Sequence, residues 1–230
     1  MTLSHPLDRP VWSSLTSRQA GLAQGDAWAV RLAPEYGVFA AAADDSDASM
    51  AALAAIAAAG EGIALVEANP VRLPEAATVA QRALVHQMSA DALTADESKS
   101  PDFEVVALTD ADAPQMLALA TLTKPGPFYA RTHRMGRFIG VKQDGRLVAM
   151  AGERMQPTGF TEVSGVCTHP DARGRGLGGA LTRIVAADIL ARGETPFLHV
   201  YATNTGAIGL YETLGFTLRR EMTMTVLTGA

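Results

Sequence analysis

The chain has 230 residues, of which 48% are hydrophobic and 19% are charged, and its formal net charge is -5. This length and balance predict one or two folded domains, and they exclude a short peptide, a disulfide-stapled scaffold and a long disordered chain. The negative charge argues against a nucleic-acid binder with a broad basic face. Residues 1–100 carry 6 basic and 12 acidic side chains, whereas residues 101–230 carry 13 and 12. An anionic ligand is therefore better accommodated by the second half.

The first residues and the most apolar run of the sequence bear on export and membrane insertion. Residues 1–12 begin with polar residues and prolines instead of a basic stretch followed by an apolar core, so we expect no signal peptide. The most apolar run, 50–59, is rich in alanine and too short for a bilayer core of about 30 Å. The single cysteine is compatible with a reducing compartment. We expect a cytoplasmic protein, a monomer or a homodimer, with no nucleic-acid or membrane partner.

A polar stretch divides the chain. Residues 96–102 lack apolar periodicity and include Pro101, which predicts a linker. Residues 1–95 before it are predicted to form a small, non-catalytic α/β domain, because they hold no glycine-rich loop and no cluster of residues at metal-ligand spacing. The elements expected in this part are a helix at 49–59 and strands at 62–66 and 78–85. Residues 103–230 are the predicted catalytic domain.

The second half alternates strands and helices. A strand at 103–108 precedes a helix at 109–122, in which Thr109 and Asp112 have the spacing of a capping box. Asp144-Gly145 is a strong hairpin signal between two predicted strands. Apolar residues at Leu181, Val185 and Ile189 have helical spacing. The predicted elements from the hairpin onward are strands at 137–142, 146–154, 161–168, 197–201 and 218–227, and helices at 177–192 and 204–214.

A glycine-rich loop at residues 173–179 lies between a predicted strand and a predicted helix. It holds four glycines and two arginines in seven residues. Glycines let the backbone approach a ligand closely, and the free N–H groups and positive dipole end of a helix N-terminus favour phosphate. The loop therefore predicts a pyrophosphate site.

Two nucleotide-binding alternatives fit this loop less well. Gly174, Gly176 and Gly179 match G-x-G-x-x-G, but a dinucleotide-binding unit needs an acidic residue just after the next strand. Here Glu194 precedes that strand, and residues 201–204 at its end are not acidic. A P-loop also needs a Gly-Lys-Ser or Gly-Lys-Thr that the sequence lacks at this position.

Residues 166–178 resemble the acetyl-CoA signature of the GNAT superfamily of N-acetyltransferases, whose core positions are filled by Arg173, Gly176 and Gly178. A second family signature is resembled by Asn204, Ala207, Tyr211, Gly215 and Phe216. The resemblance covers about residues 103–227. It implies an α+β fold, with a central mixed, mostly antiparallel sheet flanked by helices. It also suggests that residues 1–95 are a degenerate second copy of the fold.

The resemblance implies transfer of an acetyl group from acetyl-CoA, as co-substrate, directly to a primary amine of a small molecule, amino acid or peptide through a tetrahedral intermediate. In the family, the loop amides hold the pyrophosphate and the preceding strand pairs with the pantetheine arm, with the N–H of Val166 as the expected oxyanion donor. The residues expected to contact acetyl-CoA are Val166, Cys167, Thr168, Arg173, Gly174, Arg175, Gly176, Leu177, Gly178, Gly179, Asn204, Ala207 and Tyr211.

Two residues are candidates for proton transfer. Tyr211, seven positions after Asn204 and so on nearly the same helix face, is the expected general acid, since a phenol has a pKa of about 10. Glu162 is the expected base, and alternation along the strand places it on the face of Val166 unless a bulge intervenes. Glu153 and a relay through water are the alternatives.

The remaining reactive side chains are assigned no chemistry. We expect Cys167 not to act as a nucleophile, His169 and His199 to be structural, and no metal to bind.

Residues 127–135 lie where the family builds its acceptor pocket, and Phe128, Tyr129 and Arg134 are candidates to line it. An arginine there predicts an acceptor with a carboxylate. The alternative to an enzyme is a non-catalytic CoA sensor or scaffold on the same fold.

Overall fold

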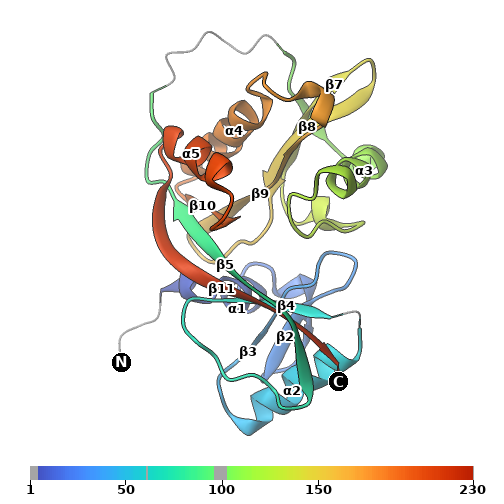
Figure 1. Cartoon of the computed structure of the whole chain (residues 1–230), viewed down its shortest axis with the longest axis vertical. Coiled ribbons are helices and arrows are strands. Elements are labelled where there is room, and N and C mark those ends of the chain that lie inside the picture. Colours follow the sequence, from blue (N-terminus) through green and yellow to red (C-terminus); the bar gives the residue numbers. More distant parts are fainter. Residues whose placement is uncertain (1–4, 61, 96–102, 230) are drawn as a thin grey trace.

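The computed structural model describes residues 5–60, 62–95 and 103–229, so the predicted linker lies outside the described residues. Helices pack against a three-stranded sheet and an eight-stranded sheet (Figure 1). The predicted mixed α+β fold is confirmed. Within the described ranges, every helix is too short or too polar to cross a membrane.

The first part of the chain contains α1 (Pro10–Leu15), α2 (Asp47–Ala58) and five strands. Ser46 caps α2 by accepting a hydrogen bond from the N–H of Ser49, and the helix packs through Met50 and Leu53 onto the small sheet. The strands are β1 (Ala23–Gly25), β2 (Ala29–Leu32), β3 (Ala40–Ala42), β4 (Ile63–Glu67) and β5 (Ala77–Ser89). Short 3-10 turns occur at Pro6–Asp8 and Ala20–Leu22.

The second part follows the predicted order of elements. Thr109 and Asp112 form the predicted capping box around a 3-10 turn, Asp110–Asp112, which leads into α3. Asp144 and Gly145 have φ angles of 49° and 77°, as a tight hairpin turn requires. The elements are β6 (Val106–Leu108), α3 (Ala113–Thr123), β7 (Phe138–Gln143), β8 (Arg146–Glu153), β9 (Phe160–Thr168), α4 (Leu177–Ala191), β10 (Thr195–Tyr201), α5 (Thr205–Thr213) and β11 (Thr217–Gly229), with 3-10 turns at Thr132–Arg134 and Pro170–Ala172.

The strand order of the large sheet is β4-β11-β5-β10-β9-β8-β7-β6. Only the β9–β10 pair is parallel, which gives the mostly antiparallel sheet expected. Strand β5, from the first part of the chain, lies between β10 and β11 and pairs with both (Figure 1). The sheet therefore combines strands from both sides of the predicted linker, and the proposed division into domains stays a prediction.

Helices cover both faces of the sheet around β9. On one face, α4 packs Leu181 and Val185 against Val163. On the other face, α3 packs Met116 and Leu119 against the cluster that contains Cys167. Strand β9 is therefore held between two apolar layers.

A bulge interrupts the alternation of β9. Met150 pairs with Cys167 but Gly152 pairs with Ser164, so the register shifts by one residue, and Gly165 has a φ of +64°. As a result Val163 and Val166, three residues apart, both pack against the α4 cluster. Glu162, adjacent to Val163, therefore lies on the face opposite Val166, and the expected common face is wrong.

Candidate active site

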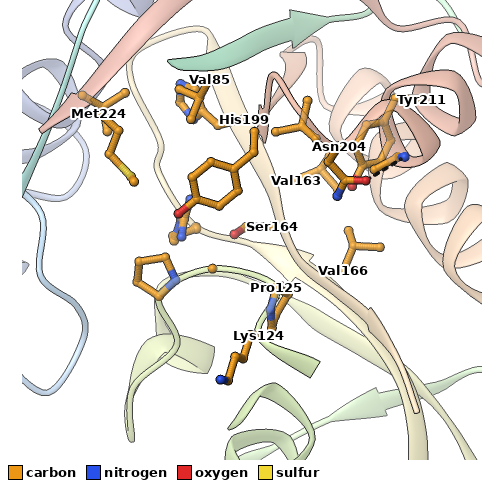
Figure 2. Close-up of a pocket in the computed structure, with 18 of the residues that line it drawn as sticks. Val85, Lys124, Pro125, Val163, Ser164, Val166, His199, Asn204, Tyr211 and Met224 are labelled. Carbon is orange, nitrogen blue, oxygen red and sulfur yellow. Dashed lines mark hydrogen bonds between the residues drawn. The ribbon is translucent and has the colours of Figure 1, made fainter. Parts of the chain in front are cut away.

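A cavity opens where β9 and β10 separate. The two strands pair only through residues 160–162 and 195–197, and then they diverge. Beyond this point residues 163–166 of β9 and 199–201 of β10 line a cavity of about 190 Å³. Figure 2 shows Ser164 and Val166 on one strand and His199 on the other, around the same space.

Helix α5 forms the wall next to Val166. Asn204 caps this helix by accepting a hydrogen bond from the N–H of Ala207 at 3.2 Å, which fixes the start of the helix at the cavity. Tyr211 lies on the same side (Figure 2), with its ring centroid 6.2 Å from that of Phe216. Burial raises the pKa of Tyr211 to about 12, so its phenol is protonated at neutral pH. In the described part of the chain the phenol makes no hydrogen bond, and its proton is available to a ligand.

The glycine loop forms the start of α4. Gly174 and Gly176 have φ angles of +76° and +73°, and a Cβ at either position meets no atom within 4 Å. Gly176 is the N-cap and provides no side chain to cap the helix, so the N–H groups of the first turn have neither an intrahelical nor a capping acceptor. Open backbone donors at the positive end of a 15-residue helix fit a phosphate group.

Glu162 lies completely buried behind the cavity wall. Arg154 donates two hydrogen bonds of 2.8 Å to its carboxylate, and His199 Nδ1 lies 2.8 Å from Oε1. Burial alone raises the pKa of Glu162, but the charge and hydrogen bonds of Arg154, with those of His199, outweigh burial and hold the pKa well below its ordinary value. Glu162 does not line the cavity, whereas Arg154 and His199 do.

The hydrogen bonds of Gln87 define the tautomer of His199. The Oε1 atom of Gln87 accepts from Arg219 at 2.8 Å, and its Nε2 donates to the carbonyl of Leu7 at 2.9 Å. The same Nε2 lies 3.1 Å from Nε2 of His199, which must therefore accept. The proton on Nδ1 faces Glu162, so both ring nitrogens of His199 are engaged in hydrogen bonds.

The other candidate residues lie away from the cavity. Glu153 is buried and accepts a hydrogen bond from Arg192 at 2.8 Å. Cys167 packs in the α3 cluster, and burial raises the pKa of its thiol to about 11. His169 accepts from the N–H of Asp171 in the turn before the glycine loop.

A second cavity, of about 400 Å³, adjoins the first. The two share part of their lining, including Lys124, Tyr201 and Met224. Of the predicted acceptor residues, Tyr129 lines the second cavity. Phe128 instead is half-buried and packs edge-on against Phe138, with the ring centroids 5.7 Å apart. The predicted role of Arg134 in an acceptor pocket is wrong, because Arg134 is bound by the exposed Asp110 outside both cavities.

Part of the cavity wall comes from the first part of the chain. Phe39, Val66 and Val85 line the first cavity, and Val38, Ile63 and Ala64 line the second. No motif in the sequence marks these residues as part of a site. Their apolar patterns predict only buried elements, and their proximity to α5 depends on the insertion of β5 between β10 and β11.

Comparisons with known proteins agree with this geometry. Residues 138–225 match the family model of FR47-like proteins. The chain is 48% identical to a GNAT-family acetyltransferase of known structure from Novosphingobium aromaticivorans, with a TM-score of 0.86 over 99% of this chain and 100% of that chain. A GCN5-related N-acetyltransferase from Kribbella flavida has the same fold, with a TM-score of 0.69 at 21% identity over 98% of this chain and 96% of that one.

Shorter matches link the chain to two mycothiol acetyltransferases. One from Thermomonospora curvata is 39% identical over 36% of this chain, and one from Thermobispora bispora is 47% identical over 40% of it. These matches span only 28% and 30% of the relatives' own lengths. The chain belongs to the GNAT family and is an acyltransferase.

Proposed function

We propose that this enzyme moves the acetyl group of acetyl-CoA directly to a primary amine of a small molecule. One observation carries the proposal: the opening between β9 and β10 brings a protonated phenol, Tyr211, beside the bulged backbone at Val166 and close to the uncapped start of α4. Acyl transfer to an amine needs these three parts together, as a proton donor, an oxyanion donor and a phosphate anchor.

The residues present fit acetyl-CoA, which supplies the activated thioester. The N–H groups of residues 177–179, with Arg173 and Arg175 beside them, are suited to the pyrophosphate. The backbone of residues 166–168 on β9 is suited to the pantetheine arm, and Asn204 and Ala207 face the space between these elements. These are residues that the resemblance to the family implies for acetyl-CoA binding, and their roles are part of the proposal.

Tyr211 is the proposed general acid. The amine nitrogen attacks the acetyl carbonyl carbon, the carbon–sulfur bond breaks, and the phenol gives its proton to the departing sulfur. The N–H of Val166 is the proposed donor to the oxyanion of the tetrahedral intermediate. The raised pKa of Tyr211 keeps the phenol in the form that donates.

Water is the proposed acceptor of the amine proton. Glu162 and Glu153 do not line the cavity, and each is bound by an arginine, so neither carboxylate is placed to take a proton from the acceptor. His199 lines the cavity but both of its nitrogens are engaged. The geometry therefore favours a water relay over either carboxylate, and Glu162 becomes a positioning residue that orients His199.

The mycothiol acetyltransferases support a small-molecule acceptor, since their name describes acetyl transfer to one. The test is release of free thiol from acetyl-CoA by the purified protein with a panel of primary amines. Calorimetry with acetyl-CoA and with NAD accompanies it. We expect amine-dependent thiol release and tighter binding of acetyl-CoA. Tighter binding of NAD, or thiol release that no amine accelerates, would overturn the proposal.

A further inference from the structure

The acceptor end of the site is apolar. Opposite Tyr211 and Asn204, the first cavity is lined by Met224 of β11 and Val85 of β5 (Figure 2). Val66 of β4 also lines this cavity. The apolar side chains that line this end of the two cavities are Phe39, Val66, Val85, Met224, Ile63 and Val226. Any group that extends from the reacting amine toward the second cavity therefore contacts mostly hydrocarbon.

The charges around the two cavities are positive or cancelled. Among the described residues that line them there is no Asp or Glu. Arg154 is paired with Glu162 directly behind the wall, and both ring nitrogens of His199 are engaged in hydrogen bonds. Lys124, which lies in the wall of both cavities, has no ion-pair partner in the described part of the chain. A second ammonium group on the acceptor finds no counter-charge here.

The size of the space limits the shape of the acceptor. The first cavity, about 190 Å³, must hold the amine and the acetyl group together. The body of the acceptor then extends past Tyr201 and Met224 into the second cavity of about 400 Å³. A slender molecule with its amine at one end fits this arrangement.

We infer that the acceptor is a monoamine in which the primary amine ends an apolar, slender body, and that diamines and polyamines are excluded. The inference rests on the proposed function, because it places the reacting amine beside Tyr211. It deepens that function by naming the chemistry of the far end of the substrate, and it assigns this specificity to side chains from the first part of the chain together with β11.

A matched pair of amines tests the class. Hexylamine and 1,5-diaminopentane have chains of equal length, and they differ in whether the far end is a methyl group or an ammonium group. We expect kcat/KM for thiol release to favour hexylamine by about 100-fold or more, because the second ammonium loses its hydration without gaining a partner. Equal or faster reaction of the diamine would overturn the inference and leave acetyl transfer itself intact.

Binding separates this inference from the proposed function. Calorimetry with each amine and the protein saturated with CoA measures preference for the far end without any chemistry. Tighter binding of hexylamine supports an acceptor with an apolar far end even if no amine is acetylated. In that case the proposed function is wrong and this inference still holds. Equal or tighter binding of the diamine contradicts the apolar class whatever the turnover.

A charge change in the wall gives a second test. Gln81 lines the second cavity and is exposed, so Gln81→Glu adds a carboxylate there without disturbing the core. We expect the diamine-to-hexylamine ratio of kcat/KM to rise about 2- to 5-fold, the range of an exposed ion pair. Gln24→Glu, an exposed change on β1 outside both cavities, is the control and should leave the ratio unchanged. A ratio that rises equally in both variants would contradict the assigned wall.

Discussion

The side chains of Glu162 and His199 form a hydrogen-bonded pair behind the cavity, with Nδ1 and Oε1 2.8 Å apart, and only the imidazole reaches the cavity. Arg154, the residue that follows β8, completes this buried unit, and its guanidinium carbon lies 4.7 Å from the centroid of the Phe39 ring. Both partners of the Glu162 carboxylate hold it away from the cavity, so we assign Glu162 a positioning role and not the role of proton acceptor.

Glu162→Gln tests that distinction. The variant leaves Arg154 without its counter-charge, and we expect it to lose about 3 kcal/mol of folding free energy. Loss of a general base lowers turnover by about 10²- to 10⁴-fold. We expect turnover of the folded Glu162→Gln enzyme to fall by less than about 10²-fold. Chemical denaturation and steady-state kinetics measure the two effects.

Glu153→Gln is the matched control, because Glu153 is also buried with an arginine at 2.8 Å, but that arginine, Arg192, does not line the cavity, whereas the partners of Glu162 do. It should leave turnover unchanged. A loss of turnover beyond 10² in Glu162→Gln, with the acid limb of the pH profile removed, would restore Glu162 as the base.

The same pair predicts a pH dependence of stability. The folded-state pKa of Glu162 is lowered, so its contribution is fully present above the ordinary pKa of about 4.3 and is lost as the pH falls toward the folded value. Wild type should therefore lose more stability than Glu162→Gln between neutral pH and the acid range. Denaturant midpoints across this range measure the difference, and parallel curves for the two proteins would contradict it.

Tyr211→Phe separates binding from chemistry. The variant keeps the ring and its contact with Phe216 but removes the proton, so turnover should fall by about 10² to 10⁴ while affinity for acetyl-CoA changes little. Tyr201→Phe is the control, since Tyr201 also lines the cavity from β10 and has no assigned proton transfer. Equal turnover in the two variants would remove Tyr211 from its role.

Gly176→Val tests the glycine loop, and Gly159→Val controls for strain. Both glycines have positive φ angles, +73° and +80°, and both have open space where a Cβ would lie. Each change should cost about 1–2 kcal/mol of stability because a side chain disfavours this backbone conformation. Only Gly176→Val should also abolish acetyl-CoA binding in calorimetry, since Gly159 precedes β9 at the end remote from the loop. Loss of binding in both variants would point to unfolding instead.

Cys167 should be chemically silent. It is the single cysteine of the sequence, and burial raises its pKa to about 11, so at pH 8 only about one thiol in a thousand is ionised. We expect iodoacetamide at pH 8 to leave the folded enzyme unmodified and active, and to label it fully after denaturation. Mass spectrometry that finds an acetylated Cys167 peptide after incubation with acetyl-CoA alone would contradict direct transfer.

Local patterns in the sequence predicted the fold of residues 103–229 well. The capping box at Thr109 and the hairpin at Asp144-Gly145 each depend on neighbours in the chain, and each is present. The three-stranded sheet was missed, because its strands of three and four residues are too short to show a period.

The site was predicted less completely than the fold. Motif residues such as Asn204 and Tyr211 do line one cavity. The bulge at Gly165 reversed the face expected for Glu162, and the isolated glycine within the strand is the one local signal of that bulge. The contribution of Phe39 and Val66 depends on strand pairing over long separations, which local propensity does not encode.

The position of β5 has a consequence for how the chain reaches its native state. Strand β11 pairs with β5 from Thr217 and Ser89 to Gly229 and Ala77, so the longest ladder of the sheet joins segments that are far apart in the sequence. Closing so large a loop is slow, because the chain loses conformational entropy before the stabilising contacts of the ladder form. Since β11 follows every other strand in sequence, β5 has an unpaired edge until the rest of the chain has been synthesised. During that interval the unpaired edge of β5 can pair with a strand of another chain. We expect chaperones to bind nascent chains in which this edge is exposed.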